Sequence, residues 1–291
     1  MAHYLDPKSD LVFKRIFGEH KNLCISLLNS MLPLEETQQI VSIEYNPSEI
    51  VPDTDALKNS IVDVRCTDNY KRQFIVEMQM YWTKSFTSRV LFNASKVYVN
   101  QLKKGKEFQF LTPVYALTFV NEIYEKLPEM QDVYYHHYKI VNIKNTERQI
   151  KGLEFVFIEL PKFKPQNRAE RKLHDLWLRF LTEIQNSTEN VAPELLENSD
   201  ISEAVRYSEI SAYNQEELDN YDQWLINTLT AKSVILDAKL EGKAEGKAEG
   251  KAEGAKEKEI EIAKNFLKLG ISLENIAKGT GLSIKEIENL K

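Results

Sequence analysis

Two carboxylates in neighbouring segments of alternating hydrophobicity are the side chains of this chain best suited to chemistry. Asp63 lies in IVDVRC and Glu77 in FIVEMQM, and the two-residue period of both segments predicts β-strands. If residues 68–72 connect them, the symmetric hairpin register pairs Val64 with Val76 and sets Asp63 opposite Glu77. Opposed side chains on antiparallel strands have Cβ atoms about 4.5–5.5 Å apart, and like charges there are destabilising. A divalent cation is the simplest compensation, because Mg²⁺ takes one or two protein carboxylates and fills its other positions with phosphate and water.

The strand pattern leaves a second interpretation open. Arg65 shares the face of Asp63 and can neutralise Glu77 in a half-exposed hairpin whose carboxylates are solvated. A register slip of one residue would place the two carboxylates on opposite faces. The same alternation predicts that Val62 and Val64 point together to the other side of the sheet.

The flanking segments predict the elements that position this hairpin. Apolar residues at helical spacing over 9–31 indicate an opening helical pair, and helical spacing returns over 84–104. Between them, residues 40–80 are rich in Val and Ile with a period of two, which predicts a strand cluster. The apolar run 113–121 is typical of a strand buried on both faces. A further strand pair is expected over 134–160, where the adjacent His136 and His137 point to opposite faces and are interpreted as structural.

The composition turns helical beyond residue 168. Apolar stripes over 169–185 and 220–240 predict helices that pack on the sheet domain. At the end of the chain, the capping box Ser283 and Glu286 and a Gly279–Gly281 connection predict two short helices that resemble a helix-turn-helix.

A four-residue repeat, LEGKAEGKAEGKAEGAKEKE, aligns its glycines along one line of a helix; they are Gly242, Gly246, Gly250 and Gly254. Each glycine costs a helix about 0.8–1.0 kcal/mol relative to alanine. Either a close helix–helix approach offsets this cost or the segment is a flexible charged linker, and the sequence leaves both open.

Composition restricts the class of protein. With 291 residues, 42% hydrophobic, the chain can bury a sizeable core, and its net charge of −6 restricts any nucleic-acid contact to a local basic face. Cys24 and Cys66 lie in apolar runs and form neither a disulfide framework nor a thiolate metal site, so metal ligands must be oxygen or imidazole. No leader and no 18-residue apolar stretch is present, so we expect a soluble, cytoplasmic protein without membrane contact.

Several segments of the chain form a recognisable series: DPKSDLVFKRIFG, NLCISLLNSML, SIVDVRC, FIVEMQM, RVLFNASKVYVNQLKKG, PVYALTFVN, HYKIVNI and FIELPKF. Together they resemble the recombination-promoting nuclease and transposase family of the PD-(D/E)xK nuclease superfamily, and the likeness covers roughly residues 6–235. The resemblance implies an α/β, restriction-endonuclease-like core in which a mixed sheet is flanked by helices. It implies that Asp63 and Glu77 occupy the Asp and Glu positions of the motif, and that the protein cleaves DNA with a divalent metal ion in recombination or transposition.

The chain departs from the motif at two positions. Val62-Asp63 replaces Pro-Asp, and the literal Pro52-Asp53 lies in a polar stretch before the strand, where we interpret it as a turn. Gln79 replaces the motif's lysine; it can orient a water or a phosphate oxygen, but it carries no charge and cannot act as a general base. Activation of the attacking water then falls on the metal.

The first helix offers two further candidates. Asp10 and Lys14 are one turn apart in SDLVFK, which matches the family's opening pattern. They form either a solvated ion pair or a support for the metal site.

On the helix after the hairpin, Arg89, Lys96 and Lys103 recur every seven residues. This basic line either follows a DNA backbone or is an ordinary solvated face.

The sequence therefore predicts four regions: a nuclease-like domain over 1–165, a helical accessory region over 166–238, a glycine-repeat helix or linker over 239–258 and a helical hairpin over 259–291. The predicted function is that of an endodeoxyribonuclease, with Asp63 and Glu77 binding Mg²⁺, or another divalent cation such as Mn²⁺ or Ca²⁺, and Gln79 positioning water or the scissile phosphate. DNA is the expected partner, and the C-terminal helices are expected to form a homo-oligomer. The alternative is a non-catalytic interaction protein that retains the fold.

Overall fold

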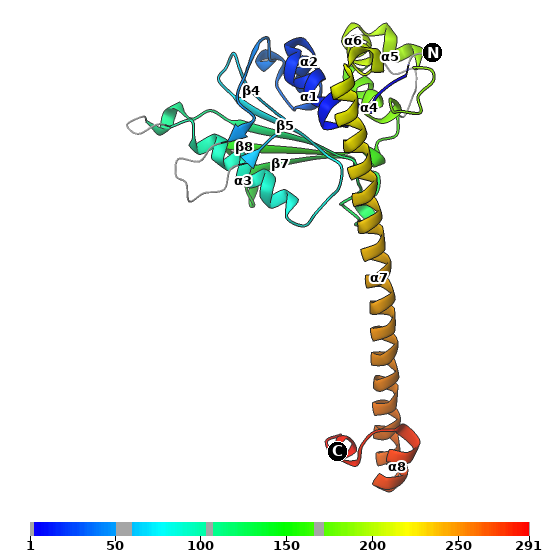
Figure 1. The fold of residues 1–291 in the computed structure, drawn as a ribbon. Coiled ribbons are helices and arrows are strands. Elements are labelled where there is room, and N and C mark those ends of the chain that lie inside the picture. Colours follow the sequence, from blue (N-terminus) through cyan, green and yellow to red (C-terminus); the bar gives the residue numbers. More distant parts are fainter. Residues whose placement is uncertain (1–2, 51–59, 103–106, 166–171, 291) are drawn as a thin grey trace. The chain divides into compact units, whose positions relative to one another are not determined.

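The computed structural model describes residues 3–50, 60–102, 107–165 and 172–290 (Figure 1). The chain divides into two compact units, residues 1–224 and 225–291, and the boundary falls within one helix, α7 (Gln215–Lys268).

The first unit is built on a six-stranded mixed sheet with the strand order β1-β4-β5-β6-β8-β7. Its strands are β1 (Ile43–Tyr45), β4 (Val64–Asp68), β5 (Gln73–Gln79), β6 (Val114–Val120), β7 (Tyr135–Asn142) and β8 (Asn145–Glu159). The central β5, β6 and β8 run parallel, while β1, β4 and β7 pair antiparallel with their neighbours. A separate pair joins β2 (Glu49–Ile50) to β3 (Ser60–Ile61). The predicted strand cluster is confirmed, and every residue of β6 is buried, as its apolar run predicts.

Helices cover both faces of this sheet (Figure 1). The opening pair, α1 (Asp10–Glu19) and α2 (Lys21–Met31), packs into the larger hydrophobic core, and α3 (Phe86–Val99) packs into a second core on the other face. The predicted face of Val62 is wrong: it belongs to the α3 core, whereas Val64 belongs to the larger core. The reason is that Asp63 forms a bend before β4, which interrupts the alternation.

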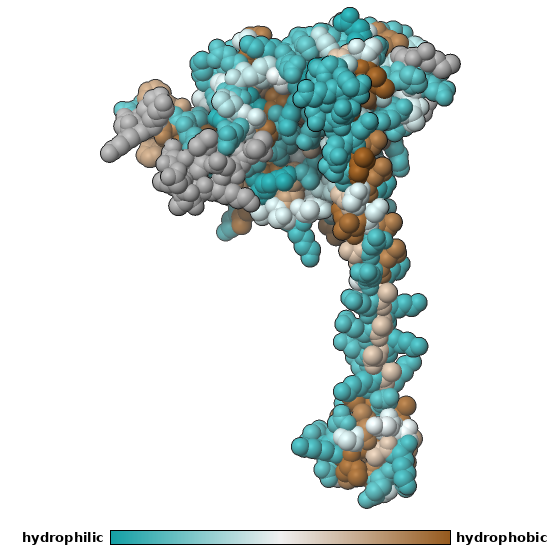
Figure 2. Space-filling model, in the orientation of Figure 1, coloured by the Kyte–Doolittle hydropathy of each residue, from teal (hydrophilic) through white to brown (hydrophobic). Residues whose placement is uncertain are grey.

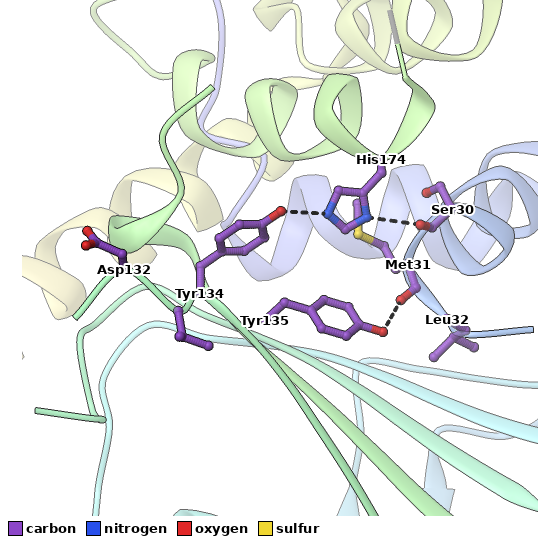
Figure 3. A pocket seen from close by; sticks show the side chains of 8 residues that line it. Ser30, Met31, Leu32, Asp132, Tyr134, Tyr135 and His174 are labelled. Carbon is purple, nitrogen blue, oxygen red and sulfur yellow. Dashed lines mark hydrogen bonds between the residues drawn. The ribbon is translucent and has the colours of Figure 1, made fainter. Parts of the chain in front are cut away.

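The larger core continues past residue 165 into three helices, α4 (Leu173–Glu183), α5 (Pro193–Glu197) and α6 (Ser199–Tyr207). His174 at the start of α4 ties it to the sheet domain, because its ring nitrogens lie 3.2 Å from the Tyr134 hydroxyl and 3.0 Å from the Ser30 carbonyl oxygen (Figure 3). These contacts line a cavity of about 430 Å³. Short 3₁₀ turns complete the unit at Glu36–Gln38, Phe108–Phe110, Pro128–Met130, Leu160–Lys162 and Ile210–Ala212.

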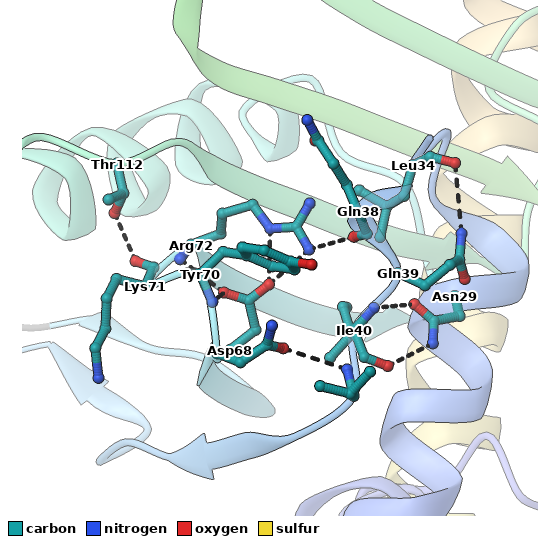
Figure 4. A network of polar contacts seen from close by, with 12 residues as sticks. Asn29, Leu34, Gln38, Gln39, Ile40, Asp68, Tyr70, Lys71, Arg72 and Thr112 are labelled. Carbon is teal, nitrogen blue, oxygen red and sulfur yellow. Dashed lines mark hydrogen bonds and ion pairs between the residues drawn. The ribbon is translucent and has the colours of Figure 1, made fainter. Parts of the chain in front are cut away.

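A buried ion pair fixes the turn between β4 and β5. The carboxylate of Asp68 accepts hydrogen bonds from the backbone N–H groups of Tyr70 and Arg72 at 2.9 and 2.8 Å, and from the Arg72 guanidinium at 2.7 Å (Figure 4). Arg72 also donates to the carbonyl oxygen of Gln38 at 2.7 Å. Lys71 takes a positive φ of 65° to close the turn. Because a slip of one residue would break this network, the turn sets the register of the hairpin.

The second unit has a small core of its own around Ala263, Ile276, Leu282 and Ile287. It contains the rest of α7, α8 (Leu273–Thr280) and α9 (Ile284–Glu288). The predicted capping box of Ser283 and Glu286 is confirmed.

The glycine repeat is helical and is surrounded by hydrophilic side chains (Figure 2). A Cβ built on Gly242, Gly246, Gly250 or Gly254 meets no atom within 4 Å among the described residues. Within the second unit, no other described segment therefore packs closely on the glycine line. Across the described residues, none of the helices combines the length and apolar character needed to span a bilayer.

Candidate metal centre

The β4–β5 hairpin has the predicted register, with Val64 paired with Val76 and Cys66 with Phe74. Asp63 lies one residue before the ladder, next to Glu77 in the continued register. Its Oδ2 accepts a hydrogen bond of 2.8 Å from the backbone N–H of Met78. The bend at Asp63 thus turns a carboxylate toward the strand that carries Glu77.

Glu77 is 6% exposed and meets an amide from α3. Nδ2 of Asn93 donates a 3.3 Å hydrogen bond to Oε1 of Glu77. Oε2 of Glu77 and Oδ1 of Asn93 are both buried without a hydrogen-bond partner in the described chain. Two buried oxygen acceptors without donors are costly in a folded protein, and a bound cation would satisfy both.

The electrostatics of the pair follow from this burial. Desolvation, followed by the charge of Asp63, raises the pKa of Glu77 to about 7, although Arg89 and the Asn93 hydrogen bond act in the opposite direction. Desolvation also raises the pKa of Asp63, against the lowering effect of the Met78 N–H. Two carboxylates whose ionised forms are disfavoured form a site that gains from a nearby positive charge.

The donor set fits a hard divalent cation. Asp63, Glu77 and the Asn93 amide present oxygen atoms, the ligand type that Mg²⁺, Mn²⁺ and Ca²⁺ prefer. Within the described ranges, no cluster of three or more His, Cys, Asp and Glu side chains is arranged to hold a metal. A cation bound by two carboxylates would therefore keep several positions for water and phosphate oxygens.

Gln79 is held in place by two hydrogen bonds. Its Nε2 donates to the carbonyl oxygen of Tyr81 at 2.5 Å, and its Oε1 accepts from Nη2 of Arg89 at 2.6 Å. The guanidinium of Arg89 lies 4.9 Å from the ring centroid of Phe86. The position of the motif's lysine thus carries a neutral amide beside a cation supplied by α3.

Lys14 reaches the site from α1, with its Nζ 3.9 Å from Oδ1 of Asp63. Asp10 acts on Asp63 through its charge, which raises the pKa of Asp63. Arg65 forms no ion pair with Glu77 in the described residues, and its Nε is buried without a hydrogen-bond partner there. A cavity of about 220 Å³, lined by Lys14, Asp63 and Arg65 among others, opens beside Asp63.

The basic residues predicted to form a line along α3 differ in their exposure to solvent. Arg89 is exposed, whereas Lys96 is 8% exposed, with its Nζ 5.3 Å from the ring centroid of Phe92. Lys103 lies outside the described residues. Asn93, four residues after Arg89 on the same helical face, is the site residue that sequence reasoning did not assign to the carboxylates.

Glu159 forms a second buried polar cluster at the end of β8. It accepts from the backbone N–H of Tyr124 at 2.7 Å, and its other oxygen lies 3.0 Å from Nε2 of His136 and 2.5 Å from Nζ of Lys162. His137 instead contacts Glu154 at 2.9 Å. The two histidines therefore have separate partners.

A mixed sheet covered by helices, with two converging carboxylates on its central hairpin, defines a restriction-endonuclease-like fold. The model of the PD-(D/E)XK nuclease family transposases matches residues 7–238, and the chain belongs to this family. No curated protein and no solved structure matches the chain.

Proposed function

We propose that this protein is a divalent-metal-dependent endodeoxyribonuclease that acts in recombination or transposition in the cytoplasm. The observation that carries the proposal is that the charge of Asp63 acts on Glu77, while Oε2 of Glu77 and Oδ1 of Asn93 are buried without a hydrogen-bond donor in the described chain. The family membership supports DNA as the substrate.

Each side chain of the site has a role in this proposal. Asp63 and Glu77 hold Mg²⁺ or a similar ion, with the amide oxygen of Asn93 close by. A cation bound there supplies positive charge to the phosphoryl oxygens and lowers the pKa of water. Gln79 orients water or the scissile phosphate, and Arg89 fixes Gln79 and contacts the DNA backbone. From α1, the charge of Asp10 raises the pKa of Asp63 and the charge of Lys14 lowers it.

The C-terminal helices are the proposed oligomerisation element. In α7, Ile226, Leu229, Leu236 and Leu240 are each more than half exposed and recur at helical spacing. Apolar residues in this pattern favour association with a second helix, and the glycine line that follows permits close approach.

Cleavage of supercoiled plasmid tests the proposed function. The parent is compared with Asp63→Ala and Glu77→Ala in Mg²⁺, in Mn²⁺ and in chelator. Metal-dependent nicking that both variants lose supports the proposal. If the parent cuts nothing, or if the variants cut like the parent, the catalytic assignment fails and a non-catalytic interaction role replaces it.

A further inference from the structure

The hairpin of β7 and β8 extends beyond the core as an exposed arm, defined as residues 138–151. All ten residues from 142 to 151 are exposed. The strands pair Val141 with Gln149 and Asn142 with Asn145, so Ile143 and Lys144 form the turn. The Asn142 side chain accepts a 2.9 Å hydrogen bond from the N–H of Lys144, which orders the tip.

The charge of this arm is opposite to that of the whole chain. The arm contains four basic residues and one acidic residue, whereas the chain carries a net charge of −6. Lys139 pairs with Glu154 at 3.5 Å. Lys144, Arg148 and Lys151 form no ion pair with any described residue, so their charges are available to a partner.

Large apolar side chains stand among these cations. Ile143 at the tip is 90% exposed, and Ile150 is 71% exposed. An exposed isoleucine on an isolated turn contributes nothing to the core, and hydrophobic side chains flanked by lysine and arginine are typical of elements that enter a DNA groove. Two-stranded ribbons of this kind fit DNA grooves.

The base of the arm lies at the end of the helix that carries Arg89. The Tyr98 ring packs over Gly152, where an added Cβ would lie 3.3 Å from the tyrosine hydroxyl. Tyr98 is nine residues beyond Arg89 on α3, about 13 Å along the helix axis. Arg89 and the tyrosine that contacts the base of the arm thus lie on one helix, α3, which packs against β8.

We propose that the arm binds duplex DNA on one side of the candidate metal centre. Lys144, Arg148 and Lys151 contact phosphates, and Ile143 packs into a groove. This inference rests on the proposed function for its substrate, but it concerns DNA affinity and not cleavage.

Fluorescence anisotropy of a labelled 30-base-pair duplex in chelator tests the arm without requiring catalysis. The variant Lys144→Gln/Arg148→Gln/Lys151→Gln is compared with the parent across a salt series. Loss of three phosphate contacts should make the slope of log K against log salt shallower by about 2–3. The same loss should lower the affinity at 0.15 M salt by about 100-fold. The matched control, Lys243→Gln/Lys247→Gln/Lys251→Gln, removes the same charge from exposed positions of α7 and should stay within about threefold of the parent.

Ile143→Ser gives an independent test, because it should weaken DNA binding while leaving the salt dependence unchanged. Equal losses in the two triple variants, or no loss in the arm variant, overturn the inference. If Ile143→Ser changes the oligomeric mass and leaves DNA binding intact, the arm is a contact between copies and the inference also fails. A parent that binds DNA through the arm but cuts nothing would contradict the proposed function alone.

Discussion

The side-chain Nδ2 of Asn93 donates a 3.3 Å hydrogen bond to Oε1 of Glu77, while Oε2 of Glu77 and Oδ1 of Asn93 are buried without a hydrogen-bond partner in the described chain. This contact joins α3 to the central hairpin at the candidate metal centre. It leaves two oxygen atoms for which a cation is a suitable partner. When no cation is bound, burying these groups costs folding free energy.

Metal-free protein should lose stability as the pH rises from about 4.5 to about 7. Burial raises the pKa of Glu77 to about 7, so the folded state binds this proton more tightly than the unfolded chain does. The free energy of unfolding should fall by on the order of 2 kcal/mol across this window and then level off, as measured by urea unfolding in chelator.

Glu77→Gln should remove most of this pH dependence, because the amide does not ionise. Glu36→Gln, at an exposed position, serves as the matched control and should behave like the parent. A Glu77→Gln protein with an unchanged slope would show that Glu77 does not titrate in this range.

The sequence predicted the hairpin register because the pairing and the turn agree: Cys66 meets Phe74, and Asp68 with Arg72 closes the connection. It could not assign Asn93 to Glu77, since that contact depends on how α3 crosses β5. The feature of the sequence that could have identified Asn93 is its four-residue spacing from Arg89, which places both side chains on one helical face.

The helical spacing of residues on α3 does not predict how deeply each side chain is buried. The spacing places Arg89 and Lys96 on one face of the helix, yet Arg89 is exposed and Lys96 is largely buried. The wrong face of Val62 has a different cause, since Asp63 leaves the strand to accept the N–H of Met78.

Gln79 and Arg89 should act as a coupled pair. Gln79→Lys places an ammonium group where Gln79 now accepts a hydrogen bond from Arg89, so it should lower kcat/KM for DNA cleavage through charge repulsion. Gln79→Lys/Arg89→Ala should recover part of this loss, with a coupling of about 1–2 kcal/mol in a double-mutant cycle. Additive effects would mean that the two side chains work independently.

Glu159→Leu should destabilise the first unit strongly. It leaves Lys162 buried without its carboxylate, which costs about 3–5 kcal/mol in comparable buried pairs. The double variant Glu159→Leu/Lys162→Met should unfold at a higher urea concentration than the single variant. A single variant within about 1 kcal/mol of the parent would contradict a structural role for this pair.

Alanine at Gly246 and Gly250 should stabilise the helical state of α7 by about 0.8–1.0 kcal/mol for each residue, because an added Cβ meets no atom within 4 Å in the described chain. The helicity of α7 should therefore rise. The added methyl groups should also weaken self-association by keeping partner helices apart. Circular dichroism and sedimentation velocity of the full chain measure both effects. If helicity rises and the mass distribution is unchanged, the glycine line is not the contact between copies.

Binding of Mn²⁺, measured by isothermal titration calorimetry, is the direct test of a metal centre formed by Asp63 and Glu77. We expect one site in the parent, with an affinity that rises with pH toward 7 as Glu77 loses its proton, and loss of that site in both Asp63→Asn and Glu77→Gln. A parent that binds no Mn²⁺, or variants that bind it as the parent does, would contradict a metal centre built on Asp63 and Glu77.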